Sequence, residues 1–352
     1  MSPPKGKIVT FKAVRHRIGM KKKYPLIAVS IFILLVAIVA GTNATGFAVK
    51  SKETNTVRIG YLPVVQGLPF YYATEKGYFN DAGLDVELTK FEAPNQIIDA
   101  LLQDNLDLGA TSTALGITGI ADYKNPGKLK IYAVAGGDLD SPNEILLVSP
   151  NSTITSINDL KGKKLGILGG SIQWRTITRY MLAQNNLEMD KDVIVVELAP
   201  SLQIQALASK QIDALLALEP IATIAKENGV GKELVSAPME KTIANPFYPG
   251  AGVVTTKFSK ENPKTTAKII EIVRRSIQEI NENPDTARLY LKNYTPLTDS
   301  TINKVPMSVF KTCNDLTQND ISAIEKFYGI FTLYKVVDGK IDFNKLSFCR
   351  VE

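Results

Sequence analysis

Two stretches of the chain decide its fold, Val57-Arg-Ile-Gly-Tyr-Leu62 and Lys164-Leu-Gly-Ile-Leu168. Each is typical of a buried strand, and each is followed in the same order by a loop, a helix, a second strand, a second helix and a third strand. Gly60 aligns with Gly166, an offset of 106 residues that is nearly constant through both copies. Strands that alternate with helices pair in parallel through right-handed crossovers. The sequence therefore predicts an α/β fold with two similar βαβ lobes.

The chain is expected to cross twice between these lobes. Apolar runs at 144–149 and 252–256 are predicted to be strands that lie side by side as hinges. We therefore expect lobe 1 to hold 57–147 and 249–352, and lobe 2 to hold 148–248. The C-terminal part has helical patterns and no sheet of its own, so we expect it to pack onto lobe 1. Its clearest helices are predicted at 264–281 and 321–337.

The N-terminal end differs from the rest in charge and hydropathy. The whole chain has 41 Lys and Arg against 35 Asp and Glu, yet segment 1–24 alone carries eight basic residues and no acidic one. The basic character belongs to this tail, and no nucleic-acid partner is expected. Segment 25–47 is apolar and about as long as a transmembrane helix needs to be.

The Lys21-Lys22-Lys23 cluster just before this apolar segment predicts that the N-terminus stays in the cytoplasm. Everything after the segment is then extracytoplasmic, beginning with a linker at 48–56. Two alternatives stay open: an uncleaved single-pass anchor in the cell membrane, or a secretory signal whose removal leaves a secreted protein. In either location Cys313 and Cys349 can form a disulfide, with two free buried thiols as the alternative.

Several kinds of chemistry have no residues to support them. The single His, His16, lies on the predicted cytoplasmic side, so no extracytoplasmic Ser-His-Asp or Cys-His site can be built. No cluster has metal-ligand spacing, and the phosphate-binding motif of ATPases is absent. We therefore expect no enzyme activity, no metal and no cofactor, and a single apolar segment does not make a permease.

An ordered set of short motifs carries a family resemblance. They are Gly60-Tyr-Leu-Pro63, Glu75-Lys-Gly-Tyr-Phe79, Gly83-Leu-Asp-Val-Glu87, Leu160-Lys-Gly-Lys-Lys-Leu165, Gly170-Ser171 and Glu219-Pro220. Together they resemble the substrate-binding proteins of ABC transporters in the group that binds sulfonates, taurine, nitrate or thiamine-pyrimidine precursors. One departure is Ala93-Pro94, where the family often has Ser-Gly.

The resemblance implies a type II periplasmic-binding-protein fold, with two lobes joined by two hinge crossovers. It also implies a monomer that binds a small molecule and delivers it to an ABC permease driven by a cytoplasmic ATPase. A sulfonate or taurine-like solute is favoured; nitrate, bicarbonate or a pyrimidine precursor are alternatives. A tethered ligand-sensing module is a further alternative. A pyrimidine-precursor synthase is the enzymatic one, and it depends on a His and clustered Cys that this chain lacks.

Ligands of open parallel sheets lie beyond the carboxyl ends of the strands. This rule selects loops in both lobes, and with them the candidate ligand-binding residues Gln66, Asn95, Ser112, Thr113, Gly170, Ser171, Trp174 and Glu219.

These residue types point to an anionic or zwitterionic organic solute. Gly170 and Ser171 lead directly into a helix, whose free N–H groups favour an anion. Ser171 is equally suited to cap that helix, and Trp174 is suited either to the cleft wall or to the core. Glu219 suits a ligand ammonium group, so an aminosulfonate would satisfy both kinds of group.

Overall fold

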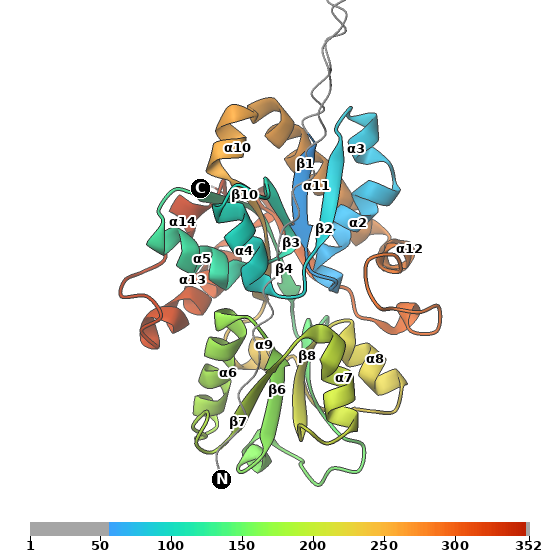
Figure 1. The fold of residues 1–352 in the computed structure, drawn as a ribbon, viewed down its shortest axis with the longest axis vertical. Coiled ribbons are helices and arrows are strands. Elements are labelled where there is room, and N and C mark those ends of the chain that lie inside the picture. Colours follow the sequence, from blue (N-terminus) through green and yellow to red (C-terminus); the bar gives the residue numbers. More distant parts are fainter. Residues whose placement is uncertain (1–55, 350–352) are drawn as a thin grey trace, which may run out of the picture. The chain divides into compact units, whose positions relative to one another are not determined.

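The computed structural model describes residues 56–349 (Figure 1). The predicted tail, the apolar segment 25–47 and nearly all of the linker lie outside these residues. Within 56–349, no helix is both long and apolar enough to cross a membrane.

The first lobe is built on a six-stranded sheet in the order β11-β4-β10-β3-β1-β2. Its strands are β1 (Val57–Tyr61), β2 (Val86–Lys90), β3 (Leu108–Ala114), β4 (Leu129–Gly137), β10 (Phe247–Thr255) and β11 (Val309–Thr312). β1 pairs in parallel with both β2 and β3, whereas β10 is antiparallel to β3 and β4. The helices before residue 125 are α2 (Leu68–Glu75), α3 (Tyr78–Asp81), α4 (Pro94–Leu102) and α5 (Leu115–Lys124).

The second lobe repeats this arrangement in a five-stranded sheet, in the order β7-β6-β8-β5-β9. Its strands are β5 (Glu144–Val148), β6 (Lys164–Leu168), β7 (Ile194–Leu198), β8 (Ala214–Leu218) and β9 (Lys232–Ser236). Its helices are α6 (Ile172–Gln184), α7 (Pro200–Ala208), α8 (Ile221–Glu227) and α9 (Pro238–Thr242). β6 pairs in parallel with β7 and β8, as β1 does with β2 and β3. The two predicted βαβ lobes are therefore confirmed.

The prediction that the two crossing strands lie side by side is wrong. β5 pairs with β8 and β9 in the second sheet, and β10 pairs with β3 and β4 in the first. Every residue of β5 and β10 is buried, which suits the middle of a sheet rather than an exposed hinge ribbon. The predicted boundary at 147/148 consequently falls inside β5. The segments that do run together are 138–143 and 243–246, where Leu139 N donates to Asn245 Oδ1 at 3.2 Å.

The C-terminal part packs onto the first lobe and forms no third sheet. Its helices are α10 (Thr256–Glu261), α11 (Pro263–Glu282), α12 (Pro284–Ala287), α13 (Gln318–Leu333) and α14 (Phe343–Leu346). α11 lies against α2, and α13 contacts both α5 and α6, so it touches both lobes. The sequence reading missed β11, a four-residue strand that extends the first sheet beside β4.

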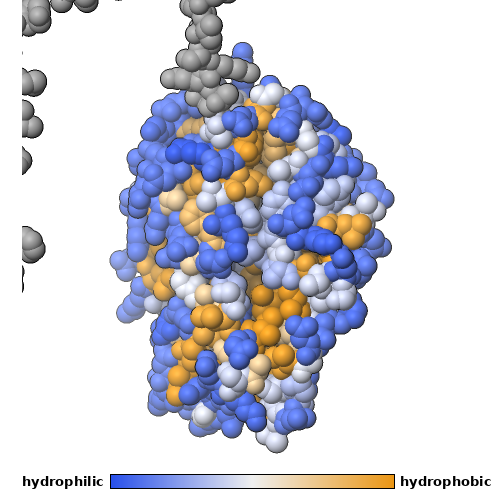
Figure 2. Space-filling view, turned by 45° about the vertical axis from the view of Figure 1, so that its right-hand side comes forward, coloured by the Kyte–Doolittle hydropathy of each residue, from blue (hydrophilic) through white to orange (hydrophobic). Residues whose placement is uncertain are grey.

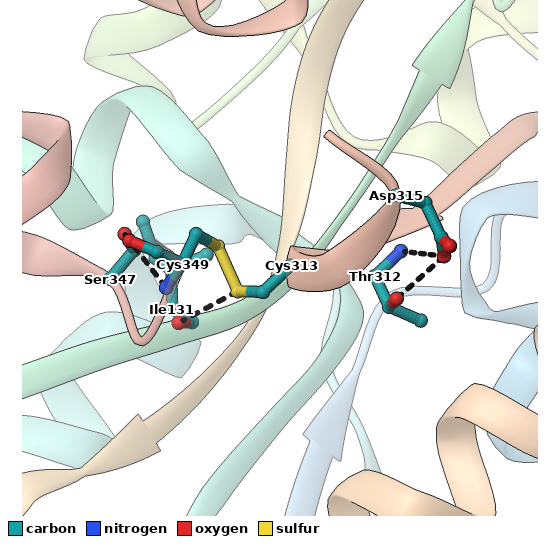
Figure 3. The surroundings of a disulfide bond; sticks show 6 residues. All are labelled: Ile131, Thr312, Cys313, Asp315, Ser347 and Cys349. Atoms are coloured by element: carbon teal, nitrogen blue, oxygen red, sulfur yellow. Dashed lines mark hydrogen bonds between the residues drawn. A yellow bond between two sulfur atoms is a disulfide. The ribbon is translucent and has the colours of Figure 1, made fainter. Parts of the chain in front are cut away.

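A disulfide joins Cys313 to Cys349 across 36 residues (Figure 3). Cys313 directly follows β11, and its Sγ lies 3.8 Å from the carbonyl oxygen of Ile131 in β4. Phe348 N donates to the same carbonyl at 2.9 Å. The bond therefore fastens the end of the described chain to the edge of the first sheet.

Removing this bond in the double variant Cys313→Ala/Cys349→Ala should lower the free energy of unfolding. Closing a loop of this length contributes about 3 to 4 kcal/mol in the chain-entropy account. Urea unfolding with and without a thiol reductant measures the loss. The reductant should destabilise the natural chain and leave the double variant unchanged; equal stability of both proteins would contradict a structural role for the bond.

Candidate ligand cleft between the lobes

The loops at the carboxyl ends of the parallel strands bring the two lobes into contact. Val65 N in the first lobe donates to the carbonyl oxygen of Glu219 in the second at 3.3 Å. On the opposing loops, a Cβ placed on Gly170 would lie 2.9 Å from Asn95 Oδ1. The carboxyl-end rule thus selected loops that meet across the junction of the lobes.

Gly170 and Asn95 are exposed residues that face each other from different lobes. Gly170 has a φ of +64°, which favours glycine, and a side chain there would also collide with Ala93. Its N–H donates to Glu197 Oε2 at 3.2 Å. This N–H was predicted to bind an anion, and in the structure it is already used by a carboxylate. Ligand contact by Gly170 and Asn95 stays a prediction.

Ser171 and Trp174 take the structural roles that the sequence left open. Ser171 Oγ accepts from Trp174 N at 3.3 Å and caps α6. Trp174 is 2% exposed and belongs to the hydrophobic core. Neither role tests ligand contact, which also stays a prediction for these two residues.

Gln66, Ser112 and Thr113 are buried and fix the loops of the first lobe. Gln66 Nε2 donates to a β4 carbonyl at 3.1 Å, and Ser112 Oγ accepts from Leu62 N at 3.0 Å. Thr113 Oγ1 donates to Ala110 O at 2.8 Å. The Thr113 hydroxyl therefore donates to a carbonyl of its own strand, whereas the Ser112 hydroxyl has no acceptor in the described part of the chain.

Glu219 is a buried carboxyl group at the contact between the lobes. Oε2 accepts from Thr223 N at 3.0 Å, and Oε1 has no hydrogen-bond partner within residues 56–349. Burial raises the pKa of Glu219 to about 7, because the charged form loses its hydration. Near neutral pH this oxygen can accept from a ligand cation.

Gln173 is an interlobe contact that the sequence analysis missed. It lies on α6 of the second lobe, and both of its amide atoms bond to the first lobe. Oε1 accepts from Gly116 N at 2.6 Å, and Nε2 donates to Pro249 O at 3.1 Å. Gly116 leaves room for this amide, since a Cβ there would lie 2.7 Å from Oε1. No periodicity or motif distinguishes Gln173 from a surface helix residue.

A second buried acidic feature, the pair Glu144 and Glu240, adjoins the crossovers. Asn143 donates to Glu144 Oε2 at 3.0 Å, while Glu144 Oε1 and both Glu240 oxygens have no donor among the described residues. Burial raises the pKa of both groups, and in Glu240 the neighbouring Glu144 carboxyl raises it further. The pair therefore retains a proton that two exposed glutamates would release.

Gln173→Ala should shift the protein toward separated lobes, because two interlobe hydrogen bonds are lost. At about 0.5–1.5 kcal/mol for each bond, the ratio of open to closed forms should rise roughly 5- to 150-fold. Small-angle scattering of the ligand-free protein should show a larger radius of gyration. Gln184→Ala, an exposed change at the other end of α6, is the control. A radius of gyration equal to that of the natural chain would contradict the role of Gln173 in holding the lobes together.

Glu240→Gln should flatten the dependence of stability on pH. Between pH 5 and 8 an unfolded glutamate is ionised while the folded pair keeps its proton, so the natural chain loses stability as pH rises. The variant keeps only Glu144, which no longer faces a second carboxyl group, so it should lose less stability. Urea unfolding at both pH values measures the difference. Glu144→Gln, which removes the other carboxyl of the pair, should flatten the slope similarly; unchanged slopes in both variants would contradict a shared proton.

Among residues 56–349, no group of three or more His, Cys, Asp and Glu side chains is placed to hold a metal ion.

Comparison with known proteins assigns the family. A protein of Bacillus subtilis (strain 168) named for the binding of aliphatic sulfonates is 27% identical over 332 residues, which covers 92% of this chain and 93% of the relative. The alkanesulfonate-binding protein SsuA from Xanthomonas axonopodis pv. citri, bound to MOPS, has a similar structure with a TM-score of 0.67. It is 17% identical, and the match covers 83% of this chain and 98% of SsuA.

The periplasmic nitrate-binding protein NrtA from Synechocystis PCC 6803 also has a TM-score of 0.67, at 17% identity, covering 84% of this chain and 86% of NrtA. These likenesses show the two-lobe fold of periplasmic binding proteins. The model of the family described as NMT1/THI5 like matches residues 65–287, more than half of the chain. The chain therefore belongs to the NMT1/THI5-like family.

Proposed function

We propose that this chain is the extracytoplasmic solute-binding subunit of an ABC importer. It captures a small sulfonate-like organic solute and delivers it to a permease driven by a cytoplasmic ATPase. Family membership and the two-lobe fold support the binding role. The basic tail followed by an apolar segment supports a tether to the outer side of the membrane.

The observation that carries the ligand assignment is unmet hydrogen-bonding capacity in both lobes. Ser112 and Ser171 are 2% and 3% exposed, and each hydroxyl accepts a backbone N–H. Neither hydroxyl proton has an acceptor in the described part of the chain, and Glu219 Oε1 has no donor there. Buried polar groups are normally satisfied, so the unpartnered Glu219 Oε1 at the junction of the lobes, with serine hydroxyls that can donate in each lobe, supports a ligand there.

A zwitterion such as an aminosulfonate satisfies all three groups. Sulfonate oxygens accept from the two serine hydroxyls, one from each lobe, and the ammonium group donates to Glu219. Nitrate would accept from the serines but has no hydrogen to donate to Glu219 Oε1, and bicarbonate has only its hydroxyl. A charged amine is the stronger donor to a carboxylate, so Glu219 favours an amine-bearing sulfonate over an inorganic anion. A ligand that bridges the lobes also stabilises their closed arrangement.

Glu219→Gln should weaken the binding of taurine and leave that of ethanesulfonate, which lacks the amine, nearly unchanged. Loss of a hydrogen bond to a charged group costs about 1.5–3 kcal/mol, or roughly tenfold to 150-fold in affinity. Taurine affinity of the natural chain should also rise from pH 6 to pH 8, because Glu219 ionises near pH 7. Isothermal titration calorimetry in sulfonate-free buffer measures both effects.

Ethanesulfonate should show no such rise with pH, which separates the Glu219 interaction from a general effect on the protein. If Glu219→Gln lost affinity equally for taurine and ethanesulfonate, the taurine amine would not contact Glu219. Binding of nitrate or bicarbonate, with no response to any sulfonate, would replace the sulfonate assignment.

A further inference from the structure

Asn-x-Thr motifs begin at Asn151 and at Asn293 within the described residues, and one more begins at Asn43 outside them. This motif is the acceptor for N-linked glycans on proteins that cross or leave the membrane. The proposed function places residues 56–349 outside the membrane, where such a motif can be used. Because short motifs also occur by chance, the folded surroundings of each asparagine decide whether the native protein can carry a glycan there.

Asn151 lies in an exposed turn directly after β5. Ser152 N donates to Ser149 O at 2.9 Å, so Pro150 and Asn151 are the two central residues of a β-turn. Asn151 and Thr153 are both exposed. Among residues 56–349, neither the Asn151 amide nor the Thr153 hydroxyl has a hydrogen-bond partner. The two polar groups that define the motif are therefore accessible together.

This turn is at the end of the second lobe that points away from the first. Val148, the last residue of β5, pairs with Ala214 at the start of β8. β8 is parallel to β6, so the turn lies at the amino edge of these strands, opposite to the loops that face the first lobe. On the face shown in Figure 2, apolar residues of the lower, second lobe gather toward the first lobe, and its outer end is mostly hydrophilic. A glycan on Asn151 would extend into solvent and stay clear of the cleft.

The surroundings of Asn293 are the opposite. Asn293 Nδ2 donates to Glu75 Oε1 at 3.2 Å, and Thr295 Oγ1 donates to the carbonyl oxygen of Leu291 at 2.8 Å. All three residues of this motif also line a cavity to which both lobes contribute walls. A glycan on Asn293 would displace its amide from Glu75 and lie where the lobes meet, so the native fold disfavours it.

We propose that Asn151 carries an N-linked glycan and that Asn293 does not. The inference rests on the proposed location of residues 56–349 outside the membrane. The donor is an oligosaccharide carried on a polyprenyl phosphate or diphosphate lipid. The Asn151 amide nitrogen forms a bond to the anomeric carbon of the first sugar and gives up one proton. The bond from that carbon to the phosphate oxygen breaks, the lipid phosphate leaves, and nothing is oxidised or reduced.

A glycan at this position would also shield an unpaired sheet edge. β9 is the last strand of the second sheet and pairs on one side only, with β5. Lys232 Nζ, at the start of β9, donates to Ser152 O at 3.2 Å, which holds the turn beside this strand. Unpaired strand edges promote association between chains, and a bulky hydrated group beside one opposes it.

The test is mass spectrometry of the full chain purified from its own organism. The natural chain should carry a sugar mass on the peptide that contains Asn151. Asn151→Gln and Thr153→Ala should both lose this mass, and Thr153→Ser, which keeps a hydroxyl at the third position of the motif, should retain it. Asn158→Gln changes an exposed asparagine nearby that belongs to no such motif. It is the matched control and should carry the same sugar mass as the natural chain.

Labelling of intact cells with a membrane-impermeant amine reagent separates this inference from the proposed function. An unmodified Asn151 on a chain that the reagent labels overturns the inference and leaves the importer role intact. An unmodified Asn151 on a chain that is protected inside the cell overturns both. A sugar on Asn293, or one on Asn151 that survives in Thr153→Ala, also overturns the inference. Taurine binding by Asn151→Gln should equal that of the natural chain, because the turn lies at the far end of the lobe from the cleft.

Discussion

The exchange of one buried strand between the lobes is the constraint on which the rest of the structure depends. The chain leaves the first lobe to form β5 inside the sheet of the second lobe, and it leaves the second lobe to form β10 inside the sheet of the first. Every residue of both strands is buried. Pulling either strand out would expose its apolar side chains and break two ladders of hydrogen bonds. The lobes therefore stay joined, and segments 138–143 and 243–246 carry the chain from one lobe to the other.

The two crossovers and the contacts of α13 with α5 and α6 join the lobes, and on the cleft side few polar contacts add to them. The polar contacts there include one backbone hydrogen bond, from Val65 to Glu219, and the two bonds of Gln173. Each contributes only about 1 kcal/mol net, because water satisfies the same groups in the open form. A ligand that binds both lobes adds its binding energy to these contacts and favours the closed form.

The sequence predicted the parts of this arrangement that depend on local pattern. The repeated βαβ order reveals both parallel sheets, and the carboxyl-end rule selects Ser112 near the end of β3 and Ser171 and Glu219 on loops of the second lobe. Pattern cannot say which sheet receives a central antiparallel strand, since a short apolar run such as β5 suits either one. It also cannot find Gln173, whose role comes entirely from Gly116 and Pro249, distant in sequence.

In the proposed function, recognition and closure depend on the same few groups. Ser112 lies in the first lobe, and Ser171 and Glu219 lie in the second, so a ligand that satisfies all three must contact both lobes at once. Their unmet hydrogen bonds are a cost in the ligand-free closed form, because buried donors and acceptors without partners are destabilising. A matching ligand removes that cost only when the lobes are together. The free energy of ligand binding then stabilises the closed arrangement of the lobes. In the proposed function, the permease at the membrane detects this closed arrangement.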